Sequence, residues 1–162
     1  MSVAVQATHW EPTGRERDVL FAELGLCVHV YQCIELRLKV LLPHLVIPGS
    51  DSHASGEGFE NWRVLLDSKK TLGALMKLLA ERTTFDDRDA GEALWLRLVE
   101  ERNEVVHHFA SQPFARLSSP EEYRDALAFL KKRRQSALPM FEMLQEFGVA
   151  FFSAVQEGLD AA

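Results

Sequence analysis

The sequence predicts an all-α protein, folded as an up-and-down bundle of four to five helices. Two observations carry this prediction. Apolar residues recur at steps of three and four over long stretches, and no stretch of any length alternates in the manner of a strand. The 162 residues suffice to bury a core as one domain. We divide the chain into an N-terminal arm, residues 1–14, and a single helical domain, residues 15–162.

The first two predicted helices flank the clearest loop of the sequence. A stripe of apolar residues at helical spacing predicts a helix over residues 15–42, and Pro43 ends it. Residues 48–58 are rich in glycine and serine and have no apolar anchor, which is typical of a loop. The next apolar stripe predicts one helix over residues 60–82.

Two further helices complete the predicted bundle. The third covers residues 88–110. The fourth covers residues 120–159 and has a strong start signal, because Ser118 or Ser119 can cap it and a proline and two acids follow. We expect Pro139 to kink this helix or divide it in two, since proline removes a helical hydrogen bond.

Composition and charge place the protein among soluble, intracellular chains. The formal charge of −6 does not favour nucleic-acid binding, so such a function needs a local basic patch. Residues 1–18 lack the apolar region of a signal peptide, and the apolar run at residues 36–47 is interrupted by charges and a proline. Cys27 and Cys33 are about two turns apart on one helix, too far for a disulfide. We predict a cytoplasmic protein.

Two charged residues interrupt apolar stripes. Glu35 lies four residues after Tyr31 and three before Leu38 on the first helix. Arg102 lies in an apolar row of the third helix, between Val99 and Val106. A half-buried guanidinium needs a carboxylate, so we predict that Glu35 and Arg102 pair where the two helices pack. The alternative is that Glu35 lies at the edge of its stripe and reaches water.

The residues around Arg102 form a candidate site. Asn103 and His107 are four apart and share one line of the helix, and Glu104 can reach the ring of His107 or of His108. Arg102 and His107 are five apart, about 140° around the helix, so we expect them to border one cleft without contacting side by side.

Arginine and histidine together suit the cleavage of a phosphodiester without a metal. Histidine can move a proton near neutral pH, and arginine can hold a phosphate and stabilise its developing charge. In RNA the 2′-hydroxyl attacks its own phosphate, so the protein needs to supply only a base, an acid and a cation. Neighbouring residues on a helix point about 100° apart, so His107 and His108 do not share a metal. We predict no metal and no cofactor.

The segment Arg102-Asn103-Glu104-Val105-Val106-His107 resembles the Arg-polar-(three residues)-His motif of HEPN domains, an all-α superfamily. Residues 24–39 and 70–75 are similar to the first and second helices of that family. The resemblance covers roughly residues 15–109, and more loosely the C-terminal helices. It implies a HEPN-like fold.

The resemblance also implies an activity. HEPN proteins are often metal-independent endoribonucleases that work as homodimers, with two motifs meeting across the seam, and their products end in a 2′,3′-cyclic phosphate. Carried over, Arg102 binds the scissile phosphate, His107 transfers protons and Asn103 orients the site. Glu35 and Glu104 support them, and His108 is a bystander. The implied setting is a toxin or a defence effector, with an antitoxin or a nucleotidyltransferase as the partner.

One position departs from the family pattern. HEPN toxins that pair with a nucleotidyltransferase often have a tyrosine two residues after the histidine, and here Phe109 has no hydroxyl to modify. Many HEPN domains are not catalytic. The alternative function is therefore a helical interaction or dimerisation module, in which His107 and His108 are a surface pair bonded to Glu104.

Two stretches of the fourth helix suggest partner surfaces. The only dense basic run suits an RNA backbone, although a solvated helix face explains it equally; it consists of Lys131, Lys132, Arg133 and Arg134. Residues 138–152 are more apolar than one core-facing stripe requires. This part of the helix is therefore either central in the bundle or a dimer seam.

Overall fold

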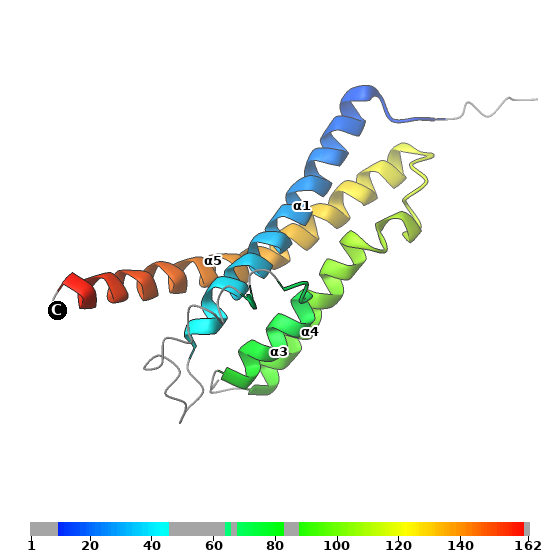
Figure 1. Cartoon of the computed structure of the whole chain (residues 1–162). Coiled ribbons are helices and arrows are strands. Elements are labelled where there is room, and N and C mark those ends of the chain that lie inside the picture. Colours follow the sequence, from blue (N-terminus) through cyan, green and yellow to red (C-terminus); the bar gives the residue numbers. More distant parts are fainter. Residues whose placement is uncertain (1–9, 46–63, 66–67, 83–87, 161–162) are drawn as a thin grey trace, which may run out of the picture.

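The computed structural model of the protein describes residues 10–45, 64–65, 68–82 and 88–160 (Figure 1). Within these residues the chain is all-α, as predicted, with four α-helices and no strand. The helices are α1 (Gly14–Leu41), α3 (Leu72–Arg82), α4 (Arg88–Val106) and α5 (Pro120–Asp160), with short 3-10 helices at Leu42–His44 and Phe109–Ser111. The predicted loop at residues 48–58 lies outside the described residues.

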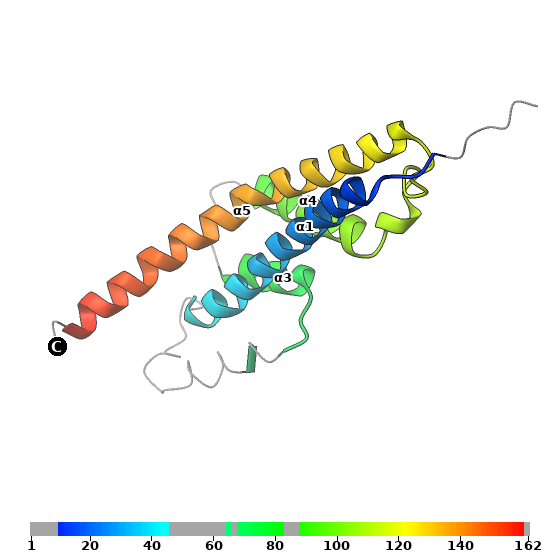
Figure 2. The same cartoon turned by 90° about the horizontal axis from the view of Figure 1, so that it is seen from above.

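Helix α1 lies at the centre of the fold. Its start is fixed by a capping box, in which the Thr13 amide donates to Glu16 Oε2 at 2.8 Å and the Glu16 amide donates to Thr13 Oγ1 at 3.3 Å. Its buried side, which includes Leu20, Ile34 and Leu38, forms the main part of the core. Helix α1 contacts α5 most extensively and also contacts α3 and α4. Figures 1 and 2 show the first half of α5 beside α1, with α3 and α4 on another side.

Helix α5 begins where the sequence predicts. The Ser119 hydroxyl accepts from the Glu122 amide at 3.1 Å, and the helix starts at Pro120. Pro139 does not divide the helix, which runs unbroken to Asp160. The helix changes direction in its orange section, the part that contains Pro139 (Figure 1), in keeping with a proline kink. Beyond that section its red end extends away from the other helices (Figures 1 and 2).

The single helix predicted over residues 60–82 is wrong, because the chain is not helical at residues 68–71. The Ser68 hydroxyl bonds back to the Leu65 carbonyl at 2.7 Å, and Lys39 Nζ of α1 donates to the Ser68 carbonyl at 2.6 Å. A side chain that bonds its own backbone in this way competes with helical hydrogen bonds. Helix α3 begins at Leu72, and the Leu75 amide donates to the Thr71 carbonyl in its first turn.

Helix α4 also ends four residues before the predicted residue 110. The amides of His107 and His108 both donate to the Asn103 carbonyl, at 2.9 and 3.2 Å, and close the last turn. Phe109 then turns onto α5, where its ring lies 6.2 Å from that of Phe129, and Phe114 completes an aromatic cluster. Packing of these rings explains why the chain leaves the helix here.

The segment Gly14–His44 is long and apolar enough to cross a membrane, with a mean hydropathy of 1.5 over 18 residues. The charges and the proline within residues 36–47 predict no membrane span there, and the segment Gly14–His44 is longer than that run. Core helices of soluble proteins and signal sequences pass the same test. In this structure 28% of that 18-residue window is buried, and Glu23 and Glu35 of α1 form ion pairs with α5 and α4.

Candidate functional site

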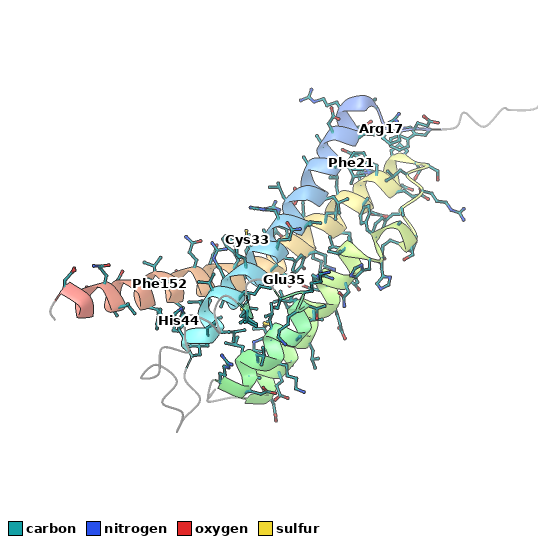
Figure 3. The ribbon with its side chains drawn as sticks, viewed as in Figure 1. Arg17, Phe21, Cys33, Glu35, His44 and Phe152 are labelled. Carbon is teal, nitrogen blue, oxygen red and sulfur yellow. The ribbon has the colours of Figure 1, made fainter. Side chains whose placement is uncertain are left out.

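The predicted ion pair between α1 and α4 is present. Arg102 Nε lies 3.4 Å from Glu35 Oε1, and the two side chains are 19% and 21% exposed. Figure 3 shows Glu35 on the side of α1 that faces α4. Each charge interrupts an apolar stripe, and the helices pack so that the two interruptions meet. The carboxylate holds the guanidinium at the surface of the helix pair, open to a ligand.

Arg102 also contacts His107, which the helical angle does not predict. Arg102 Nη1 lies 2.8 Å from His107 Nε2 and donates to Asn103 Oδ1 at 3.2 Å. The expectation that Arg102 and His107 do not meet side by side is wrong, because it placed both residues on one regular helix and α4 ends at Val106. An arginine can only donate, so this contact is a hydrogen bond in the tautomer that has its lone pair on Nε2 of His107.

These side chains line an open cavity of about 410 Å³ between α3 and α4. Its wall consists of Thr71, Leu72, Gly73, Val99, Arg102, Asn103, His107 and His108. His108, interpreted from the sequence as a bystander, lies on this wall, with its ring centroid 6.3 Å from that of His107. The sequence predicts no role in the site for Thr71 and Gly73, although residues 70–75 are those that resemble the second HEPN helix.

Glu104 faces away from the histidines and takes part in an ion network with α5. Its Oε2 lies 2.6 Å from Arg133 Nη2, and Arg133 Nη1 donates to Glu101 at 2.9 Å. Arg97 Nε donates to the same Glu101 oxygen at 3.0 Å. Glu101 is only 4% exposed. The network joins α4 to α5. No signal in the sequence distinguishes the buried Glu101 from its exposed neighbour Glu100, so Glu101 was not predicted.

The basic run of α5 does not form one patch. Arg134 donates to Glu23 of α1, with Nε 2.6 Å from Oε1 and Nη2 3.5 Å from Oε2, and this hydrogen bond raises the pKa of Arg134. Arg133 is held by the glutamates of α4. Only Lys131 and Lys132 are exposed. Both arginines predicted for RNA contact therefore face other helices.

A second, apolar groove of about 760 Å³ lies between the C-terminal halves of α1 and α5. Its lining includes Leu36, Val40, Leu144, Val149 and Phe152. Several of these side chains are exposed, Val149 by 64%. Figure 3 shows Phe152 on α5 and Cys33 on the side of α1 away from Glu35.

The fold and the site define an all-α protein with an arginine–histidine cleft. No group of three or more His, Cys, Asp or Glu side chains in the described part of the chain is placed to hold a metal ion. No protein-family model, curated protein or solved structure matches the chain. The HEPN resemblance rests on the residues of the motif and on the helices that carry it.

Proposed function

We propose that the protein is a HEPN-like, metal-independent endoribonuclease of the cytoplasm that acts as a homodimer. The observation that carries the proposal is the contact of Arg102 with His107 in an open cavity, with Glu35 fixing the arginine from α1. A toxin or defence effector is the setting that the resemblance suggests. Phe109 lies in an aromatic cluster and has no hydroxyl for a nucleotidyltransferase to modify.

The geometry supports a separate catalytic role for each of three side chains, those of Arg102, His107 and His108. A phosphate that enters the cavity competes with His107 for the Arg102 guanidinium, which frees the Nε2 lone pair. His107 then takes the proton of the 2′-hydroxyl, and the 2′-oxygen attacks phosphorus. The bond to the 5′-oxygen breaks, and we assign the proton that this oxygen requires to His108 on the same wall. The products are a 2′,3′-cyclic phosphate and a 5′-hydroxyl.

Cleavage of diverse single-stranded RNAs in EDTA tests this assignment. We expect Arg102→Ala to lower the rate by a factor of about 10²–10³, and His107→Ala by about 10²–10⁴. Arg116→Ala, an exposed arginine outside the cavity, serves as the control. Cleavage that survives both site substitutions would contradict the assignment. If the wild type cleaves none of the RNAs, the alternative holds, and the protein is a non-catalytic HEPN-like interaction module.

The homodimer is proposed from the groove between α1 and α5. The end of α5 extends beyond the other helices (Figure 2), and Phe147, Phe152 and Val155 on it are each more than 40% exposed. Helices in proteins are stabilised mainly by packing of an apolar face, so this end needs a partner. A second copy is the occupant we infer, because a two-fold axis would pair the same apolar surface with itself.

This seam affects how the catalytic site is built. Glu35, which pairs with Arg102 of the cleft, and Val40, which lines the groove, are five residues apart on α1, about 140° around the helix. The groove and the cleft therefore lie on different sides of α1. A dimer through the groove leaves the two clefts apart. We therefore propose that each protomer carries a whole site, unlike the shared site that the family resemblance implies.

A further inference from the structure

The cleft that holds Arg102 and His107 continues into a second cavity along the same pair of helices. This cavity has a volume of about 320 Å³ and lies between α3 and α4. Gly73 and Val99 line both cavities, so the two meet at this shared wall. Val99 precedes Arg102 by three residues, about 5 Å along the helix axis.

The two cavities differ in chemistry. The second cavity is lined by apolar side chains, among them Ala80, Leu96 and the largely buried Met76 and Trp95, and also by the charged Lys77 and Glu92. The first has the guanidinium, the amide and the imidazoles. One strip of surface thus pairs a charged end, which suits a phosphate, with an apolar end that includes an aromatic side chain. Single-stranded RNA has the same division, since its bases stack on aromatic and apolar side chains while arginine binds its backbone.

We propose that the cavity between Met76 and Trp95 is a subsite for a nucleobase that flanks the phosphate held by Arg102. The inference rests on the proposed function and names a part of the substrate that the Arg–His cleft does not explain. Gly73 and Val99 lie at the boundary that the two cavities share. A Cβ atom at position 73 would lie 3.6 Å from Val99 Cγ1, an ordinary van der Waals distance, so α3 and α4 pack closely at this boundary.

A binding experiment tests the subsite without requiring catalysis. The probe is a short 2′-O-methyl oligoadenylate, which cannot be cleaved because the attacking hydroxyl is blocked, and the control ligand is an abasic backbone of the same length. With methyl-labelled methionine, we expect the oligoadenylate to shift the Met76 signal and the abasic backbone to leave it unchanged. Met143, on α5 and outside both cavities, reports non-specific effects. A Met76 signal unmoved at saturation overturns the proposal.

A pair of tryptophan substitutions provides a second test of the base subsite. Ala80→Trp fills the apolar cavity and does not touch the Arg–His wall, and Ala74→Trp places the same side chain on α3 at an exposed position outside both cavities. We expect Ala80→Trp alone to weaken oligoadenylate binding at least about fivefold, because the added side chain occupies the proposed base subsite. Equal affinities of the two variants overturn the subsite.

The two arms separate this inference from the proposed function. If the wild type cleaves RNA and the Met76 methyl signal does not shift with oligoadenylate, the proposed base subsite is wrong and the proposed ribonuclease activity is retained. If Met76 responds and no RNA is cleaved, the base subsite stands and the catalytic proposal fails.

Discussion

Arg133→Met tests whether the basic run of α5 binds RNA or holds the fold together. Methionine keeps an unbranched apolar chain in place of the arginine stem and removes the charged guanidinium. The change takes the α5 partner away from Glu101, which is 4% exposed, and from Glu104. Loss of one member of a buried ion pair costs about 3–5 kcal/mol. We expect about 3 kcal/mol, because the Arg133 side chain is 18% exposed and Glu101 keeps Arg97.

Urea unfolding followed by circular dichroism measures this loss. With a slope of about 2 kcal/mol per molar, the midpoint should fall by about 1.5 M. Lys132→Met, one residue away and exposed, should change the free energy of unfolding by less than about 0.5 kcal/mol. Adding Glu101→Gln to Arg133→Met should cost less than the sum of the two single changes, since the residues are in contact. A variant as stable as the wild type that has lost RNA affinity would refute this reasoning and return Arg133 to the RNA-binding surface.

Three further predictions follow from the groove, the cleft and the cysteines. If the proposed homodimer forms through the groove, Val149→Lys should give a monomer in sedimentation equilibrium with an unchanged helical spectrum, and a persisting dimer would place the seam elsewhere. Mixed dimers of Arg102→Ala and His107→Ala protomers should stay inactive, because the two side chains contact each other within one chain; restored cleavage would show that the site is shared across the seam. In the Val149→Lys monomer, iodoacetamide at pH 8 should label Cys33 and spare Cys27, because burial raises the pKa of the Cys27 thiol to about 11, and mass spectrometry showing two labels per chain would contradict this.

Periodicity predicted the all-α class and the extents of α1 and α5, because these helices are long. The start of α5 at Pro120 was predictable from its cap, which is a local signal. The break at residues 68–71 was not, because Lys39, a residue of another helix, binds the Ser68 carbonyl in addition to the local hydrogen bond of the Ser68 hydroxyl. The early end of α4 depends likewise on rings from outside that helix.

The candidate site was predictable only in part, for related reasons. The pairing of Glu35 with Arg102 could be inferred because a charge in an apolar stripe requires a partner. These two residues have opposite charges, and each interrupts the apolar stripe of its own helix. The inward orientation of Arg133 could not, because four consecutive basic residues sample every side of a helix. The neighbour that each one meets depends on how α5 lies against α1 and α4.

The ion pairs of α4 also set its rotation about its own axis. Glu101 and Arg102 are consecutive, so their side chains leave the helix about 100° apart. One is held by α5 and the other by α1. Apolar side chains tolerate a small turn of a helix, because their contacts have no fixed direction. Two ion pairs that point in different directions do not tolerate such a rotation, because a rotation of α4 that shortens one ion pair lengthens the other. The angle at which the cleft presents its guanidinium is therefore determined by electrostatic contacts on both sides of α4.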